Sequence, residues 1–362
     1  MSKARELAEL GAVYDSGALA NRNMIINGAM QVSQRSTAAH NEGTGYFALD
    51  RWRQEKANQD QFTYSVEQVS DGPSGFSKCL RVTTSTAETA LASDEFGRIQ
   101  QIIEGNNLER IGFGTTDAKP FTLSFYVKSS VTGNYAVSFY VADANVIYNK
   151  AYTINTANTW EYKTLTFPAY TTAGPTIDNT AGLTLNFGLF AGSAKTTVTT
   201  NWTSYTQAYL FGGQTANLAA TLNSSWRITG CQLEVGTEAT PFEHRSFDDE
   251  LISCYRYYQQ LKNTLGTHYL GINQAYSTGA VFGQIRNYII PMRTVPTVGQ
   301  DGNFSFSQAD SAATNTGAIA NFAANNSGWY CGGWSGGSNL VYGGASVLYW
   351  AINAKLTADA EL

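Results

Sequence analysis

Charged side chains are scarce in this chain of 362 residues. Its 23 Lys and Arg and its 28 Asp and Glu together make 14% of the sequence, against about 25% in an ordinary soluble protein. The deficit does not indicate disorder, because disordered chains lack aromatic residues and this chain has 18 Phe, 21 Tyr and 7 Trp. Thr, Ser, Asn and Gly replace the missing charge, a composition typical of strands and turns.

Basic residues and long apolar runs are also few. A net charge of −5 argues against the basic stripe that binding to a phosphate backbone requires. No run of about 18 apolar residues occurs, so we expect no membrane-spanning helix. The first residues, MSKARE, do not have the pattern of a secretory signal peptide. The sequence therefore predicts neither a nucleic-acid partner nor membrane insertion.

Catalytic and metal-binding signatures are missing as well. The four cysteines form no C-x-x-C pair and the three histidines form no H-x-x-x-H motif, so no zinc ligand set is visible. Neither a G-x-S-x-G elbow nor a Walker loop is present. The densest acidic spots are Asp94-Glu95, interpreted as a solvated loop, and residues 248–250, interpreted as the start of a helix. We therefore expect no catalytic residue, no enzyme activity and no cofactor.

Strand patterns fill residues 21–245. Within residues 121–128, apolar side chains alternate with polar ones, and residues 137–141 repeat the pattern after Thr132-Gly133-Asn134, which predicts a hairpin. Further alternating runs occupy residues 62–69, 160–167, 183–190 and 226–235. Strands at this spacing, with no helical pattern between them, predict an all-β fold in which antiparallel sheets pack as a jelly-roll sandwich.

A short helix is expected within residues 1–20. Ser2 can cap it, and Gly11 can end it. About two turns of helix are not stable alone in water. This segment is therefore either a frayed tail or a peptide that docks on a partner.

A second helix is expected to connect two β regions, over residues 246–265. Ser246 and Asp249 form an acidic variant of the capping box, and acidic residues fill the first turn. One face of this helix, extending to about Leu261, would carry Leu251, Tyr255 and Tyr258. That face either makes contacts in a trimer or packs on the sandwich of its own chain.

Residues 266–362 return to strand patterns, notably at residues 281–290 and 347–352, and predict a second, smaller β domain.

Aromatic residues in this second domain lie beside Gly, Asn and Ser, a pattern suited to sugars, which stack on aromatic rings while polar side chains bind their hydroxyls. The candidate glycan-binding residues are Trp329, Tyr330, Trp334 and Tyr342, with Trp160 and Trp202 in the first domain. A Trp in a strand is more often part of a core, so the glycine-rich region is favoured.

Several stretches resemble a family of bacteriophage tail fibre and tail spike proteins. The first two are NRNMIINGAMQVSQR at residues 21–35 and YFALDRW at residues 46–52. The most specific stretch begins with ITGCQLEVG at residues 228–236, continues with ATPFEHRS at residues 239–246 and ends with CYRYY at residues 254–258. PMR and VPT, at residues 291–297, and the terminal ADAEL resemble the C-terminal module of that family.

The first domain also resembles galactose-binding-like carbohydrate-binding modules, through the opening phrase NMIING and the closing strand QLEVG. Such modules often hold a structural calcium where the terminal strands join, but many have an acid where this chain has Gln232. The tail fibre resemblance implies a homotrimer, attachment to phage tail or portal and adaptor proteins through residues 1–20, and a host-surface polysaccharide as the target.

We therefore expect a virion protein, a tail fibre or short tail spike made in the host cytoplasm, with a jelly-roll domain at residues 21–245 and a C-terminal β domain at residues 266–362. Two alternatives are a capsid or tail decoration protein that binds no glycan, and a polysaccharide depolymerase with acids gathered across a subunit interface.

Overall fold

The structure is a computed structural model, and it describes most of the first 264 residues and the greater part of the rest. The described residues are 3, 21–40, 43–57, 62–264, 268–277, 280–281, 284–302, 304–308, 311–317, 322–331, 334–335, 342, 345–350 and 353–362. Apart from residue 3, the predicted N-terminal helix lies outside them. None of the described helices has the length and apolar character needed to cross a membrane.

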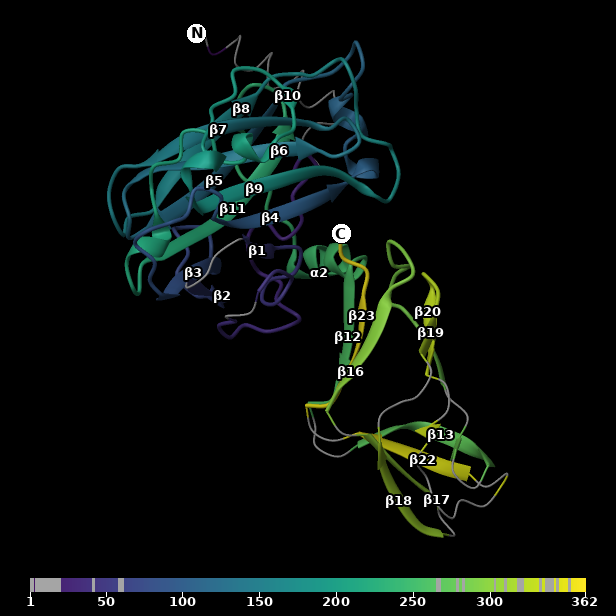
Figure 1. The fold of residues 1–362 in the computed structure, drawn as a ribbon. Helices are drawn as coiled ribbons and strands as arrows, with labels where there is room; N and C mark the ends of the chain where they lie inside the picture. Colours follow the sequence, from purple (N-terminus) through teal and green to yellow (C-terminus); the bar gives the residue numbers. More distant parts are fainter. Residues whose placement is uncertain are drawn as a thin grey trace. The chain divides into compact units, whose positions relative to one another are not determined.

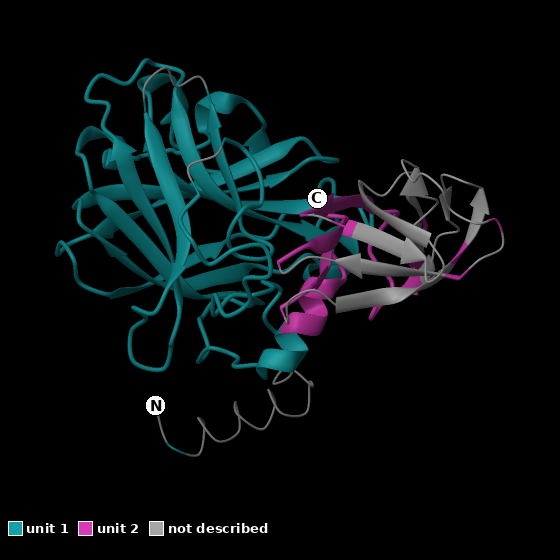
Figure 2. Ribbon diagram, turned by 90° about the horizontal axis from the view of Figure 1, so that it is seen from below, with its two compact units in different colours: residues 1–250 teal, residues 251–362 magenta. Residues whose placement is uncertain are grey.

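The chain forms two compact units, residues 1–250 and residues 251–362 (Figure 2). The division falls inside helix α2 (Phe247–Tyr255).

Unit 1 consists of two antiparallel sheets (Figure 1). The first has the strand order β1 (Arg53–Ala57), β4 (Phe96–Glu104), β9 (Ala181–Ala191), β6 (Gly133–Val141), β7 (Val146–Ile154) and β10 (Thr203–Ser204). The second has the order β2 (Thr63–Val69), β3 (Cys79–Thr86), β11 (Ser225–Val235), β5 (Phe121–Ser129) and β8 (Glu161–Phe167). Short 3-10 turns in the connections are η1 (Gly105–Asn107), η2 (Glu109–Ile111), η3 (Ser193–Lys195), η4 (Gln207–Tyr209) and η5 (Leu218–Ala220).

The hydrophobic core lies between these two sheets, because each strand directs its apolar row inward. Phe121, Leu123, Phe125 and Val127 of β5 are fully buried, and the ring of Phe125 meets Phe187 of β9 at 5.1 Å. Unit 1 is thus the all-β jelly-roll sandwich that the sequence predicts.

The predicted hairpin of residues 121–128 with residues 137–141 is wrong. Strand β5 pairs with β11 and β8, whereas β6 pairs with β7 and β9 in the other sheet. The rings of Phe121 and Phe139 instead face each other across the core at 5.1 Å. Alternation determines which side of a strand is buried, and both arrangements bury the same rows.

Helix α2 begins as predicted and ends earlier than predicted. The amide of Asp249 donates to Oγ of Ser246 (3.1 Å), and this hydroxyl donates to the Asp249 carboxylate (2.6 Å), which confirms the capping box. The helix ends at Tyr255, because residues from Tyr258 onward pair as strand β12 with β23. Tyr258 is 5% exposed within the chain, so the predicted face of a helix reaching Leu261 does not exist. The trimer itself remains a prediction.

The described residues of unit 2 form three antiparallel sheets (Figure 1). One has the order β12 (Tyr258–Lys262), β23 (Lys355–Asp359) and β16 (Thr297–Asp301). The largest has the order β18 (Ser311–Gly317), β17 (Phe304–Gln308), β22 (Ala345–Trp350), β13 (His268–Ser277), β14 (Ala280–Val281) and β21 (Trp334–Ser335). The third has the order β15 (Gln284–Asn287), β20 (Gly328–Cys331) and β19 (Phe322–Ala324).

Candidate binding site

Three of the four candidate glycan-binding residues of unit 2 lie on strands. Trp329 and Tyr330 lie on strand β20, and Trp334 lies on β21, which belongs to a different sheet. The side chains of these three residues lie outside the described part of the structure. Tyr342 lies in a turn with 77% of its surface exposed. Glycan binding by these four residues stays a prediction.

The two tryptophans predicted in unit 1 have different surroundings. Trp202 packs at the edge of the core, with its ring 4.9 Å from that of Phe113, and its Nε1 donates to the carbonyl of Pro168 (2.9 Å). These contacts support a structural role for Trp202, and glycan binding by it stays a prediction. Trp160 lies just before β8, where Nζ of Lys128 stands 5.4 Å from the centre of its ring.

Two tyrosines form an aromatic surface on the outer face of the five-stranded sheet. Tyr126 belongs to the polar row of β5, opposite in direction to the buried row of Phe125. Its partner across the ladder is Tyr162 of the edge strand β8, and the two rings lie 4.9 Å apart. Tyr162 is 47% exposed, so part of its ring remains available to a ligand.

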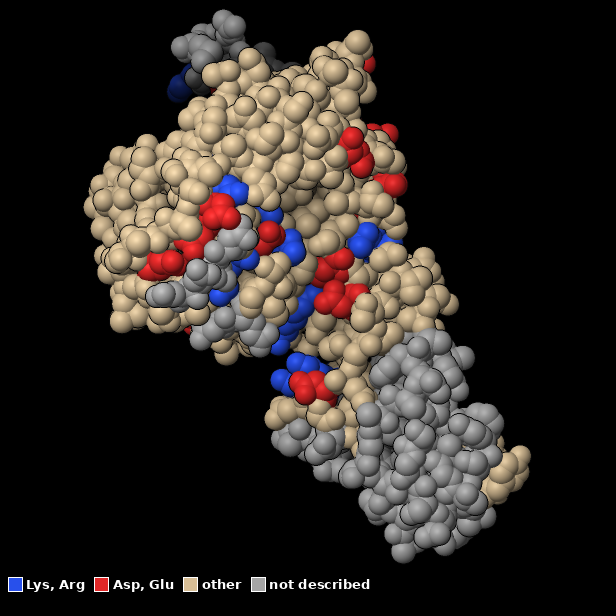
Figure 3. Space-filling model, in the orientation of Figure 1, with Lys and Arg blue, Asp and Glu red and all other residues tan. Residues whose placement is uncertain are grey.

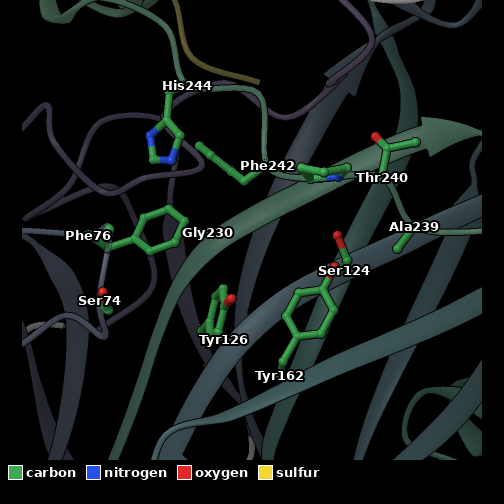
Figure 4. Close-up of a pocket in the computed structure, with 12 residues that line it drawn as sticks. Ser74, Phe76, Ser124, Tyr126, Tyr162, Gly230, Ala239, Thr240, Phe242 and His244 are labelled. Carbon is green, nitrogen blue, oxygen red and sulfur yellow. The ribbon is translucent and has the colours of Figure 1, made fainter. Parts of the chain in front are cut away.

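Three more rings form a wall beside these tyrosines (Figure 4). Phe76 comes from the loop between β2 and β3, and its ring lies 5.5 Å from Tyr126. Phe242 and His244 follow β11, and their rings lie 5.0 and 5.2 Å from Phe76. The five rings enclose a hollow of about 490 Å³, which we call the aromatic hollow. Its remaining lining residues are Ser74, Gly75, Ser124, Gly230, Ala239, Thr240 and Pro241.

Gly230 allows the rings to approach the sheet. Strand β11 has a bulge between Thr229 and Gln232, and Gly230 has a φ of +62° within it. A Cβ at this position would lie 2.8 Å from Cζ of Phe76 and 3.1 Å from Cδ2 of Tyr126. Both the left-handed backbone and the close contact therefore require glycine.

The aromatic hollow is lined by uncharged side chains and by His244. No Asp, Glu, Lys or Arg is among its lining residues. On the same outer face, Lys128 and Arg227 both pair with the Asp71 carboxylate, at 2.8 and 3.1 Å. Figure 3 shows acidic and basic side chains in small groups on an otherwise mostly uncharged surface of unit 1.

The thiol of Cys79, on strand β3 of the same sheet, is unsuited to nucleophilic chemistry. Burial, reinforced by the charge of Asp71, raises the pKa of Cys79 to about 11, so the thiol stays protonated near neutral pH. Among the described residues, no group of three or more His, Cys, Asp or Glu side chains is placed to hold a metal ion. The arrangement offers ring faces for stacking and hydroxyls for hydrogen bonding.

The joined ends of the sandwich do not fit the calcium site that the resemblance implies. A calcium ion needs about six to eight oxygen ligands. Here Gln232 turns its Nε2 toward Oε1 of Glu234 (2.9 Å), and the amide of Thr240 donates to the same oxygen (2.9 Å). The Glu243 carboxylate accepts the amide of Asn23 (2.8 Å). The oxygens of these carboxylates thus accept hydrogen bonds from N–H donors, where a calcium site would direct them toward the ion.

None of the glycan-binding residues predicted from the sequence lines the aromatic hollow. Tyr126 and Tyr162 belong to different strands, and only their pairing places them together. The sequence nevertheless contains one sign of this aromatic surface. Each of the two tyrosines occupies the outward row of a strand, where polar residues are expected.

Comparisons with known proteins give no family. No family model matches the chain, and no curated protein matches its sequence. Solved structures similar to it include carbohydrate-binding modules and one phage tailspike domain. The enzymatically active domain of tailspike protein 4 from bacteriophage CBA120 is 13% identical, with a TM-score of 0.33; the match covers 59% of this chain and 22% of that one.

Two further structures match over their whole length. The module TmCBM61, in complex with β-1,4-galactotriose, is 8% identical with a TM-score of 0.31, over 60% of this chain and 100% of that one. A putative sugar-binding protein from Bacteroides thetaiotaomicron is 12% identical with a TM-score of 0.33, over 59% of this chain and 100% of that one.

Proposed function

We propose that unit 1 binds carbohydrate in the aromatic hollow. The observation that carries this proposal is the half-exposed Tyr162 ring, held against Tyr126 and facing a wall of further rings with hydroxyls at its edges. Sugars bind to such surfaces through the apolar faces of their rings, while a few polar groups fix their orientation.

The preferred ligand is a neutral sugar. An acidic sugar would lose water on entering the aromatic hollow and would find no Lys or Arg among the lining residues to compensate. We expect binding without hydrolysis, because the lining includes no pair of carboxylates to act as acid and base.

A glycan array tests this proposal directly. The purified chain is applied to neutral glucans, galactans, mannans and xylans and to sialylated and uronate-containing glycans. Selective binding to neutral glycans is the expected result, and no selective binding at all would overturn the proposal. Release of reducing ends from a bound polysaccharide would instead favour the depolymerase alternative.

We further propose that the chain is a tail fibre or short tail spike that adsorbs a phage to a polysaccharide of the host surface. The stretches at residues 21–35 and 228–258 support this role through their resemblance to that family. Three weak sites in a homotrimer would bind with enhanced avidity, because one bound site raises the effective concentration of the others.

Labelling of this chain in electron micrographs of intact particles tests the virion role. Signal at the tail would support it, whereas signal spread over the capsid would favour the decoration alternative.

A further inference from the structure

The wall of the aromatic hollow depends on a segment without regular secondary structure. Residues 237–246, here called the return segment, follow β11 and carry Thr240, Phe242 and His244 back over the outer face of the sheet. No helix or strand fixes this segment, so bonds from neighbouring side chains determine where its rings lie.

Gln232 makes the first of these bonds from strand β11. Its side chain is fully buried, and its Oε1 accepts the backbone amide of Glu243 (2.8 Å). Its Nε2 donates to Oε1 of Glu234 (2.9 Å) and to the carbonyl of Thr240 (3.2 Å). One carboxamide thus holds the return segment on either side of Phe242.

Glu234 makes the second set of bonds, two residues further along the same strand face. Its Oε1 accepts the amide of Thr240 (2.9 Å), and its Oε2 accepts the Thr240 hydroxyl (2.6 Å). Glu234 is 3% exposed, and such charge-assisted bonds are stronger than bonds between neutral groups.

Glu243 links the return segment to the beginning of the sandwich. Its side chain accepts the backbone amides of Asn21 and Asn23, the latter at 2.8 Å. The guanidinium of Arg245 adds a bond to the carbonyl of Asn23 (2.7 Å). Residues 21–23 therefore share one support with the wall of the aromatic hollow.

We propose that Gln232, Glu234 and Glu243 are the positioning residues of the aromatic hollow, and that residues 21–23 belong to the same support. This inference rests on the proposed function of the hollow. None of the three side chains lines the hollow, so each acts through the placement of Phe242 and His244. Removing one partner leaves buried donors unsatisfied, which releases the segment.

The test uses the full chain and the substitution Gln232→Glu. A carboxylate at this position cannot donate to Glu234 or to the carbonyl of Thr240, and it repels Glu234, so the bonds that hold residue 240 should weaken. The amide of Glu243 keeps an acceptor at position 232. The substitution Glu238→Gln is the matched control, because Glu238 is exposed and lies in the same segment. Affinity is measured for the brightest neutral oligosaccharide of the array, and amide hydrogen exchange is measured at residues 240 and 243.

We expect Gln232→Glu to weaken binding about tenfold and to accelerate exchange at the amide of residue 240 more than at that of residue 243, while Glu238→Gln changes neither binding nor exchange. The exchanged pair Gln232→Glu with Glu234→Gln restores one donor and one acceptor, and should recover part of both losses. Unchanged exchange in Gln232→Glu would overturn the positioning role. If the natural chain binds none of the glycans, the proposed function fails, while the exchange rates still decide the positioning role.

Discussion

Replacing Tyr162 by Ala should weaken sugar binding while leaving the sandwich folded. Tyr162 lies on the edge strand β8 and is 47% exposed, so its ring contributes more to the ligand surface than to the core. The change removes one face of the aromatic hollow and also the packing on Tyr126, whose ring lies 4.9 Å away.

The expected magnitude follows from the exposed area. An aromatic side chain presents about 150–250 Å², so the exposed 47% of Tyr162 is about 70–120 Å². A sugar stacked on one side covers about half of that, which at about 25 cal/mol per Å² is worth about 0.9–1.5 kcal/mol. Because 1.4 kcal/mol is about tenfold in affinity, the Kd should rise about four- to twelvefold. The lost Tyr126–Tyr162 packing should lower the free energy of unfolding by about 0.5–1.5 kcal/mol.

Calorimetric titration with a neutral oligosaccharide measures the affinity, and urea unfolding measures the stability. Tyr162→Phe retains the ring and should bind nearly as well as the natural chain. Thr164→Ala alters an exposed residue of the same strand that does not line the hollow, and it should have no effect. If Tyr162→Ala remains folded and binds with undiminished affinity, the sugar does not occupy the aromatic hollow.

Three further changes test the structure. Gly230→Ala should lower both the unfolding temperature and the affinity, since the new Cβ would lie 2.8 Å from the Phe76 ring at a φ of +62°; a chain that binds normally would contradict this. The pKa of Glu161 is about 2, because hydrogen bonds from Lys163 and from the amides of residues 155 and 156 outweigh the effect of burial. The stability it contributes is therefore present above pH 4.5 and lost as the pH falls toward 2, and urea midpoints should show Glu161→Gln losing less over this range. Burial raises the pKa of Glu250 above 4.5, although the amide of Asn27 donates a hydrogen bond to its carboxylate. The folded protein therefore favours the protonated form, and the stability that this form contributes is lost as the pH rises through the raised pKa. Glu250→Gln should remove that loss, and a variant less stable than the natural chain at pH 8 would contradict the reasoning.

The sequence predicts the positions of the strands better than it predicts which strands pair with each other. Burial of one sheet face imposes a period of two, so the rows around Phe125 and Phe187 can be read directly. Pairing depends on contacts between distant residues, and the same pattern fits a hairpin or two facing strands equally well. The short connection between β5 and β6 favours the hairpin, but their apolar rows meet across the core instead.

The predicted end of helix α2 shows the same limit. Tyr255 and Tyr258 have helical spacing, which predicts a continuous aromatic face. Strand β23, almost a hundred residues later in the sequence, pairs with residues 258–262 and takes them out of the helix. A long-range ladder thus overrides a local preference.

The candidate site is hidden from sequence for a related reason. Tyr126 and Tyr162 become neighbours only when β5 and β8 pair. Phe242 lines the same hollow from the return segment, which Gln232 and Glu234 bind. Aromatic residues in the outward row of a strand are the local sign of such a surface.

The uncharged lining of the aromatic hollow has a consequence for the conditions under which it can bind. Dissolved salt weakens attraction between exposed charges, with a screening length of about 10 Å at 0.1 M and about 3 Å at 1 M. Stacking on Tyr162 and hydrogen bonds to neutral hydroxyls are not screened in this way. Attachment through the hollow should therefore be nearly independent of ionic strength, and a particle that used it would adhere equally well in dilute and in saline water.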